Sequence, residues 1–352
     1  MQQKWSGTGK HMAFKTRITE MLGIEHPIVQ GGMQGVGRAE LASAVSNAGG
    51  FGILTGLTQP TPDDLKKEIE RCRSMTDKPF GVNMTVFPTI NAPDYKAYAK
   101  AIIDMGIKAV ETAGTPAVAE IWEMFKAADV RIIHKCTAVR HAVSAQKKGV
   151  DAISIDGFEC AGHPGEDDIP GLILIPAAAD KVTIPMLASG GFGDGRGLVA
   201  ALALGAEGIN MGTRFCATVE APIHPNVKQA YIDNDERGTN LIFRKLHNTA
   251  RVGKSAVSDK VVEILAQPDA TFKDVQAYVA GAKGRVVLEE GDMDAGIFWA
   301  GMIQGLIHDI PTCRELIDRI VADATAIVCT ILSSIGLAMP PILYLLQSPK
   351  IP

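Results

Sequence analysis

The chain has 352 residues, of which 46% are hydrophobic and 21% are charged, a balance typical of soluble globular proteins. Its net charge of −4 supplies no basic surface, so nucleic acid is excluded from the expected partners. The length exceeds that of a bare eight-stranded α/β barrel, about 250 residues, by roughly 100 residues. A second structural element is therefore expected beside any barrel.

The first residues differ in character from the rest of the chain. Residues 1–11 are polar and lack periodicity, which predicts a disordered extension with Met12 as an alternative start. No signal peptide is evident, and the six cysteines fall at irregular positions. This usage predicts reduced thiols and a cytoplasmic location.

Between residues 12 and 215, short apolar runs alternate with stretches of helical spacing. Eight runs are strand candidates: 27–30, 51–56, 79–85, 109–114, 131–135, 152–157, 185–191 and 208–215. Helical spacing covers 39–47, 62–74 behind a Thr61 cap, 95–105, 116–127, 139–148 and 195–204, with 172–180 the weakest case. Alternation of strand and helix predicts a parallel sheet, and eight units predict an α/β fold closed as a (β/α)8 TIM barrel. A doubly wound open sheet is the structural alternative.

Segment 154–168 is the most informative part of the chain. It begins as a buried strand, breaks at Gly157, and then presents His163 followed by three acids at 166–168. Enzymes with α/β folds carry their chemistry on such strand ends. The alternative is an acidic surface turn, but the small Ala161 and Gly162 would let a flat ligand approach the backbone closely. His163 is therefore a candidate catalytic residue.

Glycines lie towards the ends of the seventh and eighth strand candidates. Barrels commonly bind phosphate in the loops at these two places, through backbone N–H groups. Gly190 and Gly191 end the seventh candidate, and Gly212 and Thr213 lie in the eighth. We predict that these residues hold a phosphate, with tight turns as the alternative. Residues 195–200 match the pattern G-x-G-x-x-A but lie inside a helix, which does not favour a dinucleotide-binding fold.

A third polar group ends the fifth strand candidate. Alternation places His134 and Cys136 on one face of the strand and Lys135 on the other. With Cys160 and His163, the first two could form a zinc site, so a zinc hydrolase barrel is an alternative. The spacings match no common zinc motif, and other strand ends lack the expected ligands. We therefore predict no metal, and a Lys135 that faces an anionic cofactor group.

Residues 216–318 show no clear strand rhythm and are predicted to form a helical insertion. Within them, 291–306 repeats small residues at intervals of four, which predicts a tightly packed helix. This segment would share in the site if it closes over the barrel mouth. We expect residues 319–352 to form a C-terminal helix and an apolar tail. Positions 324–349 carry no charge, but Pro340-Pro341 interrupts them, so a docked helix is favoured over a membrane anchor.

Six motifs in order resemble the nitronate monooxygenase (2-nitropropane dioxygenase-like) flavoprotein family. They read QGGMQ at 30–34, GVNMT at 81–85, HKC at 134–136, DGFECAGHPG at 156–165, ASGG at 188–191 and NMGTRF at 210–215. The run CAGHPGEDD is similar to the subgroup of FMN-dependent NADH:quinone reductases. The resemblance extends from about residue 14 to about residue 327.

The resemblance implies a barrel with non-covalent FMN at its C-terminal mouth and a helical insertion over the site. Carried over by position, the flavin ring would contact Gly32, Met33, Gln34, Thr85, Lys135, Ala161 and Gly162. The phosphate would be held by Gly190, Gly191, Gly212 and Thr213, and His163 would stand near the reactive edge. One departure concerns the pocket: Gly35 stands where the subgroup often has an aromatic residue.

The implied activity is two-electron transfer from NADH through FMN to a quinone. The alternative within the family is oxidation of alkyl nitronates with O2. Both reactions use small-molecule substrates, and both suit an imidazole that titrates near neutrality. The resemblance does not specify an oligomeric state, and the interrupted apolar tail makes a membrane partner unexpected.

Overall fold

The computed structural model describes residues 14–86, 92–114 and 116–335. The extension predicted at residues 1–11 and the end of the apolar tail, residues 336–352, lie outside the described residues. Among the helices that are described, none is long and apolar enough to cross a membrane.

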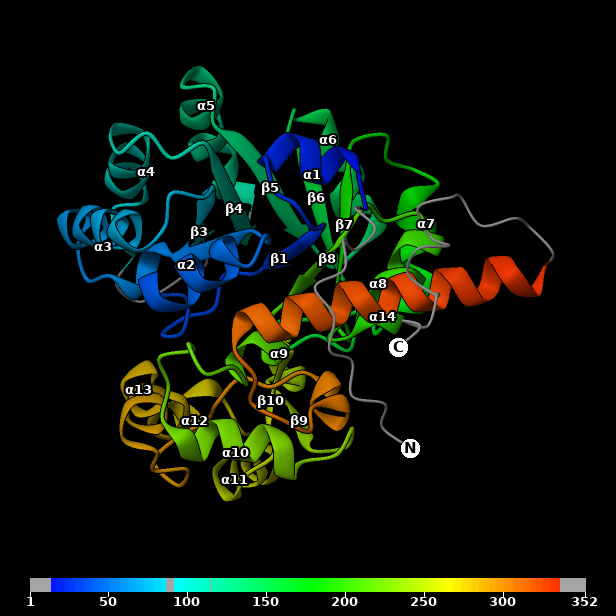
Figure 1. Ribbon diagram of the computed structural model, residues 1–352. Helices are drawn as coiled ribbons and strands as arrows, with labels where there is room; N and C mark the ends of the chain where they lie inside the picture. Colours follow the sequence, from blue (N-terminus) through cyan, green and yellow to red (C-terminus); the bar gives the residue numbers. More distant parts are fainter. Residues whose placement is uncertain (1–13, 87–91, 115, 336–352) are drawn as a thin grey trace.

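Eight parallel strands form a barrel (Figure 1). They are β1 (Ile28–Gln30), β2 (Gly52–Thr55), β3 (Phe80–Val86), β4 (Ala109–Gly114), β5 (Arg131–Cys136), β6 (Ala152–Asp156), β7 (Met186–Ser189) and β8 (Ile209–Met211). Hydrogen-bonded neighbours follow the order β1-β8-β7-β6-β5-β4-β3-β2, and a parallel bridge between Val29 and Phe51 joins the two ends. The sheet is therefore nearly closed, which confirms the predicted (β/α)8 barrel over the open doubly wound sheet.

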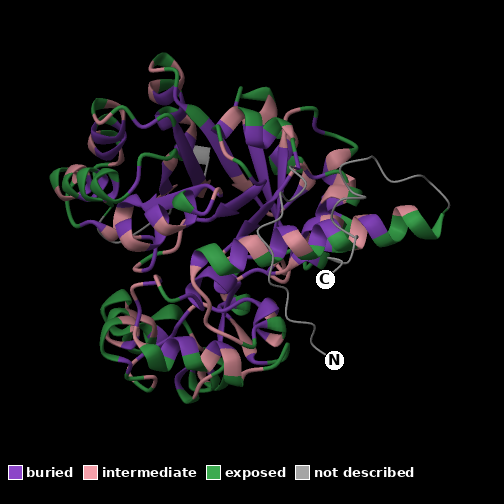
Figure 2. Cartoon of the chain, in the orientation of Figure 1, coloured by how far each residue is buried: buried purple, intermediate pink, exposed green. Residues whose placement is uncertain are grey.

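Helices follow the strands and surround the barrel. They are α2 (Ala39–Asn47), α3 (Pro62–Met75), α4 (Tyr95–Asp104), α5 (Ala119–Ala127), α6 (Val139–Lys147), α7 (Gly171–Ala179) and α8 (Gly195–Ala203), with short 3-10 turns η1 (Gly56–Thr58) and η2 (Pro116–Val118). Thr61 caps α3 as predicted, and its hydroxyl accepts a hydrogen bond from Asp64 N at 3.1 Å. Figure 2 shows the strands buried and the surrounding helices with one exposed face.

The last helix, α14 (Cys313–Ser334), packs along α8 and α2 (Figure 1). It begins before the expected residue 319 because Thr312 and Glu315 form a capping box. A Cβ on Gly195 of α8 would stand 2.6 Å from Ala324 N. This first glycine of the G-x-G-x-x-A match therefore permits close packing of two helices.

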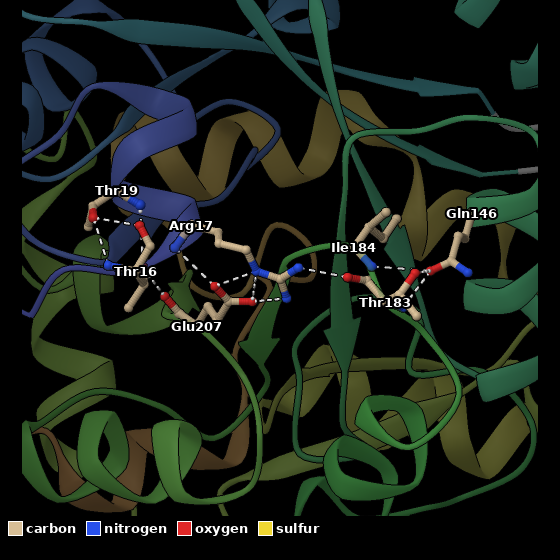
Figure 3. Close-up of polar contacts among 7 residues, drawn as sticks. All are labelled: Thr16, Arg17, Thr19, Gln146, Thr183, Ile184 and Glu207. Atoms are coloured by element: carbon tan, nitrogen blue, oxygen red, sulfur yellow. Dashed lines mark hydrogen bonds and ion pairs between the residues drawn. The ribbon is translucent and has the colours of Figure 1, made fainter.

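The amino-terminal end of the barrel is closed by α1 (Arg17–Leu22), whose Ile18 and Leu22 pack into the barrel interior. Figure 3 shows the polar contacts that fix this helix. Arg17 Nε donates to Glu207 Oε1 at 2.8 Å, and Arg17 Nη1 donates to the carbonyl of Thr183 at 2.7 Å. A ligand must therefore enter from the opposite end, where the carboxyl ends of the strands lie.

A mainly helical set of elements, here called the second domain, follows β8. It contains α9 (Thr213–Cys216), α10 (Pro225–Asp233), β9 (Thr239–Ile242), η3 (Arg244–Leu246), β10 (Ala250–Gly253), α11 (Ala256–Leu265), α12 (Phe272–Val279), α13 (Gly281–Glu290) and η4 (Met302–Leu306). The antiparallel pair of β9 and β10 was not expected from the sequence. Each strand has four residues, too few for an alternating pattern to emerge. The hairpin packs on α11 and α12 in a hydrophobic cluster of its own.

The helix predicted at 291–306 is wrong: only the 3-10 turn η4 forms there. Gly301 N donates to Thr213 Oγ1 at 2.9 Å, and Met302 N donates to the carbonyl of Glu159 at 3.0 Å. A Cβ on Gly301 would stand 3.1 Å from Ala161 N. The small residues do permit close packing. The segment that packs is an extended backbone and not a helix, and it packs against the loop after β6.

Candidate active site

A cavity of about 1060 Å³ lies at the carboxyl ends of the barrel strands, and residues of the second domain contribute to its walls. All twelve residues that the sequence analysis selected line it: Gly32, Met33, Gln34, Thr85, Lys135, Ala161, Gly162, His163, Gly190, Gly191, Gly212 and Thr213. They come from loops and strand ends distributed around the barrel. The structure thus brings the predicted residues together, while their individual roles stay predictions.

The turn after β7 contains two residues that only glycine tolerates easily. Gly190 and Gly191 have φ angles of +82° and +84°. A Cβ on Gly190 would also stand 2.8 Å from the carbonyl of Gly157. Gly212 and Thr213 lie between β8 and the body of α9. Backbone N–H groups in such glycine turns suit the oxygens of a phosphate.

Lys135 and Asp156 form an ion pair at the floor of the cavity. Lys135 Nζ lies 3.4 Å from Asp156 Oδ2, and both residues line the cavity. Burial alone would lower the pKa of Lys135, but the attraction of Asp156 and Glu111 raises it above its ordinary value. Lys135 is therefore a cation at neutral pH. The second oxygen, Asp156 Oδ1, is buried without a hydrogen-bond partner in the protein.

Glu111 on β4 was missed by the sequence analysis. Its side chain is fully buried, and its Oε1 accepts hydrogen bonds from Gly32 N at 3.0 Å and Asn83 Nδ2 at 2.8 Å. Its Oε2 accepts from Asn210 Nδ2 at 2.8 Å. One carboxylate thus fixes the turn after β1 and joins β3 and β8. An acid within the apolar run 109–114 was the signal that could have identified it.

The turn after β1 also carries Met33 and Gln34. Met33 N donates to Thr55 Oγ1 at 2.8 Å, and Gln34 Nε2 donates to the carbonyl of Leu57 at 3.1 Å. Gly35 follows with a φ of +79°, and its Cβ would stand 2.8 Å from Leu288 Cδ1 of α13. Leu288 of the second domain therefore occupies the space beside Gly35, and a larger side chain at position 35 would have to displace it.

His163 lies on the loop after β6 and faces the same cavity as Trp299 of the second domain. The two ring centroids are 6.0 Å apart, and the ring planes are tilted by 43°. Burial lowers the pKa of His163, and the negative charge of Glu166 opposes this effect only in part. The imidazole is therefore mainly neutral at pH 7, with one N–H donor and one acceptor nitrogen.

His134 does not join His163 in a metal site. Its Nδ1 lies 3.0 Å from Thr112 Oγ1, and its ring packs edge-on against Trp122 of α5 at 4.7 Å. Burial lowers the pKa of His134 to about 4. Among the residues that the structure describes, no group of three or more His, Cys, Asp or Glu side chains is arranged to hold a metal ion. The zinc site considered above is not assembled there.

Comparison with known proteins gives consistent matches along the chain. A family model described as nitronate monooxygenase matches residues 15–121 and 101–323. A relative from Rhodococcus jostii, (3aS,4S,5R,7aS)-5-hydroxy-7a-methyl-1-oxo-octahydro-1H-indene-4-carboxyl-CoA dehydrogenase, is 34% identical, over 88% of this chain and 96% of that protein. A probable nitronate monooxygenase from Staphylococcus haemolyticus is 30% identical, over 88% and 97%. The solved structure of FabK from Thermotoga maritima superposes with a TM-score of 0.84 at 34% identity, over 91% and 99%.

Proposed function

The chain belongs to the nitronate monooxygenase family of oxidoreductases, and we propose that within it the protein is an FMN-dependent NADH:quinone reductase. The observation that carries this proposal is the placement of His163 beside Trp299 in the cavity, where burial lowers the pKa of the imidazole and favours its neutral form. An aromatic wall and a single N–H donor suit a flat, uncharged molecule with carbonyl oxygens, which is the chemistry of a quinone.

The residues present fit FMN. The left-handed Gly190 and Gly191 leave space and backbone donors for a phosphate, together with Gly212 and Thr213. Lys135 offers a cation, and Asp156 Oδ1 is a buried acceptor without a donor. Single-ligand sites usually measure about 300–1,000 Å³. A cavity of about 1060 Å³ therefore leaves space for a substrate beside the cofactor.

When bound, FMN supplies the capacity to accept and release two electrons. The protein supplies orientation and electrostatics. Lys135 would bind an electron-rich group of the cofactor, and Glu111 would hold the turn of Gly32 against it. His163 would donate its N–H to a quinone oxygen and so hold the substrate for reduction. Trp299 and Leu288 would exclude water from one side.

The alternative activity is a nitronate monooxygenase that uses O2. The relative from Staphylococcus haemolyticus carries that name. A nitronate, however, is an anion that a charged imidazolium would bind best, and burial disfavours this charged form of His163. The name of the Rhodococcus jostii relative adds a third substrate class, CoA thioesters, that a test must include.

The test is anaerobic stopped-flow mixing of the FMN-loaded protein with NADH, NADPH, an alkyl nitronate and a CoA thioester in separate experiments. We expect NADH to bleach the flavin absorbance fastest, and a quinone to restore it. Fast bleaching by the nitronate with no response to NADH would replace the proposal with the monooxygenase. Fast turnover of only the CoA thioester would assign the protein to that third class.

A further inference from the structure

Residues 157–168, here called the His163 loop, are held by the hairpin of the second domain. The backbones of Gly162 and Arg251 form an antiparallel bridge: Gly162 N donates to the carbonyl of Arg251 at 3.0 Å, and Arg251 N donates back at 2.6 Å. This pair lies one residue before His163. Gly162 of the loop thus pairs with β10 in the way that one residue of a third strand of the β9–β10 hairpin would.

The Arg251 side chain adds a second contact with the His163 loop. Its Nη2 donates to the carbonyl of Phe158 at 2.9 Å, and its guanidinium lies 4.7 Å from the centre of the Phe158 ring. Its Nη1 donates to Thr239 Oγ1 of β9 at 2.8 Å. A buried arginine with these contacts fixes the beginning of the loop relative to both strands of the hairpin.

Thr249 and Glu166 make the third contact, on the other side of His163. Thr249 N donates to Glu166 Oε1 at 2.7 Å, and Thr249 Oγ1 donates to Glu166 Oε2 at 2.6 Å. Both bonds are charge-assisted and therefore stronger than neutral ones. Farther along, Arg244 Nη2 donates to Asp168 Oδ2 at 2.8 Å. His163 is consequently bracketed by contacts at positions 162 and 166.

We propose that Thr249 is a positioning residue: through Glu166 it holds His163 at the cavity, so the second domain sets the geometry of the substrate-facing imidazole. The inference rests on the role proposed for His163. The hairpin has its own hydrophobic cluster, and the barrel has another. Loss of one hydroxyl contact should therefore leave both domains folded while the loop shifts.

The test is a double-mutant cycle with Thr249→Val, His163→Ala and the double variant. Thr249→Val removes the hydroxyl at nearly constant volume, and Thr249→Ser restores it. Thr325→Val is the matched control, because Thr325 is a buried threonine of α14 whose hydroxyl donates only to the carbonyl of Val321, at 2.8 Å. Each variant is measured for quinone reduction, for FMN affinity and for hydrogen exchange in the His163 loop.

We expect Thr249→Val to slow quinone reduction about tenfold or more, since a shift of about 1 Å in a catalytic group can cost up to 10²-fold. FMN affinity should stay within about twofold, and hydrogen exchange of the Gly162 amide should increase. Thr249→Ser should recover most of the rate. In the His163→Ala background, Thr249→Val should change the rate by less than about twofold.

Equal effects of Thr249→Val with and without His163 would overturn the inference, because the threonine would then act independently of the imidazole. If Thr249→Val does not fold, Glu166→Ala removes the same contact from the other side and enters the same cycle at pH 8, where the imidazole is neutral with and without the charge of Glu166. A His163→Ala variant with normal half-reactions would instead overturn the role proposed for His163. The control gives one more outcome against the inference. Thr325→Val would then raise hydrogen exchange in the His163 loop as much as Thr249→Val does.

Discussion

Lys135 Nζ lies 3.4 Å from Asp156 Oδ2 at the carboxyl ends of the neighbouring strands β5 and β6. Because Asp156 Oδ1 has no partner in the protein, this buried pair is satisfied only in part by the chain itself. A buried polar atom without a partner costs free energy, and such atoms concentrate where ligands bind. The pair therefore marks the floor of the cavity as the place to test for cofactor contact.

Lys135→Met should raise the FMN dissociation constant about tenfold or more, because a charge-assisted contact of about 1.5–3 kcal/mol is lost. Fluorescence titration of the apoprotein with FMN measures this change. Lys135→Met also leaves Asp156 without its cation and so destabilises the protein. The titration is therefore run well below the unfolding temperature of the variant. Lys100→Met is the control, since Lys100 pairs with Asp104 on the surface of α4. Unchanged FMN affinity in Lys135→Met would assign Lys135 to a structural role.

The cofactor itself is predicted to be non-covalent FMN. The glycine turns at 190–191 and 212–213 offer one phosphate site, and the sequence predicts no second site for an adenylate. The protein should therefore purify yellow, and heat denaturation should release FMN that chromatography separates from FAD. Release of FAD, or a protein that takes up no flavin after reconstitution, would contradict this prediction.

Glu111→Gln should lower the free energy of unfolding by about 1–3 kcal/mol. The amide NH₂ would then face an N–H group that donates a hydrogen bond to the carboxylate in the native protein, and this hydrogen bond would be lost. The donors concerned are Gly32 N, Asn83 Nδ2 and Asn210 Nδ2. Denaturant unfolding of the apoprotein gives the value. Glu120→Gln on the exposed face of α5 should change it by less than about 0.5 kcal/mol. Equal losses in the two variants would show that Glu111 has no special role.

The barrel was predictable because its signals are local. Strand, helix and turn residues recur within each unit, and a helix cap such as Thr61 is visible three residues from its partner. The contacts of the His163 loop are of another kind. Glu166 and Thr249 are 83 positions apart, and each strand of the hairpin has four residues. Periodicity cannot identify such a pairing, since it depends on where the second domain docks.

The same limit explains Trp299 and Glu111. Trp299 lies in a stretch where small residues predicted a helix. The carbonyl of Phe298 there accepts from Gly253 N of β10, and Met302 N donates to the loop after β6, so outside the turn η4 this backbone bonds largely to other segments. Glu111 lies in a correctly predicted strand, yet its hydrogen-bond donors come from the turn after β1 and from β3 and β8. Sequence patterns located the helices and strands. The polar contacts around the cavity could be identified only from the folded structure.

His163 should determine how quinone reduction depends on pH. Burial holds the pKa of His163 below the ordinary value of 6.5. The imidazole is therefore mainly neutral at pH 7 and becomes charged only as the pH falls below 6.5. An imidazolium still donates N–H to a quinone oxygen and gives up a proton more readily, so the rate constant should be constant above pH 7 and rise as pH decreases through a midpoint below 6.5. Stopped-flow quinone reduction between pH 5 and pH 8 measures this midpoint.

Two variants distinguish His163 from other groups. His163→Ala should remove the inflection and slow quinone reduction while FMN binding is retained. Glu166→Gln removes the negative charge that opposes burial, so the pKa of His163 should decrease and the midpoint should move to lower pH. A midpoint that moves to higher pH, or an inflection that persists in His163→Ala, would mean that a different group titrates. The imidazole would then be a neighbour of the reaction with no part in it.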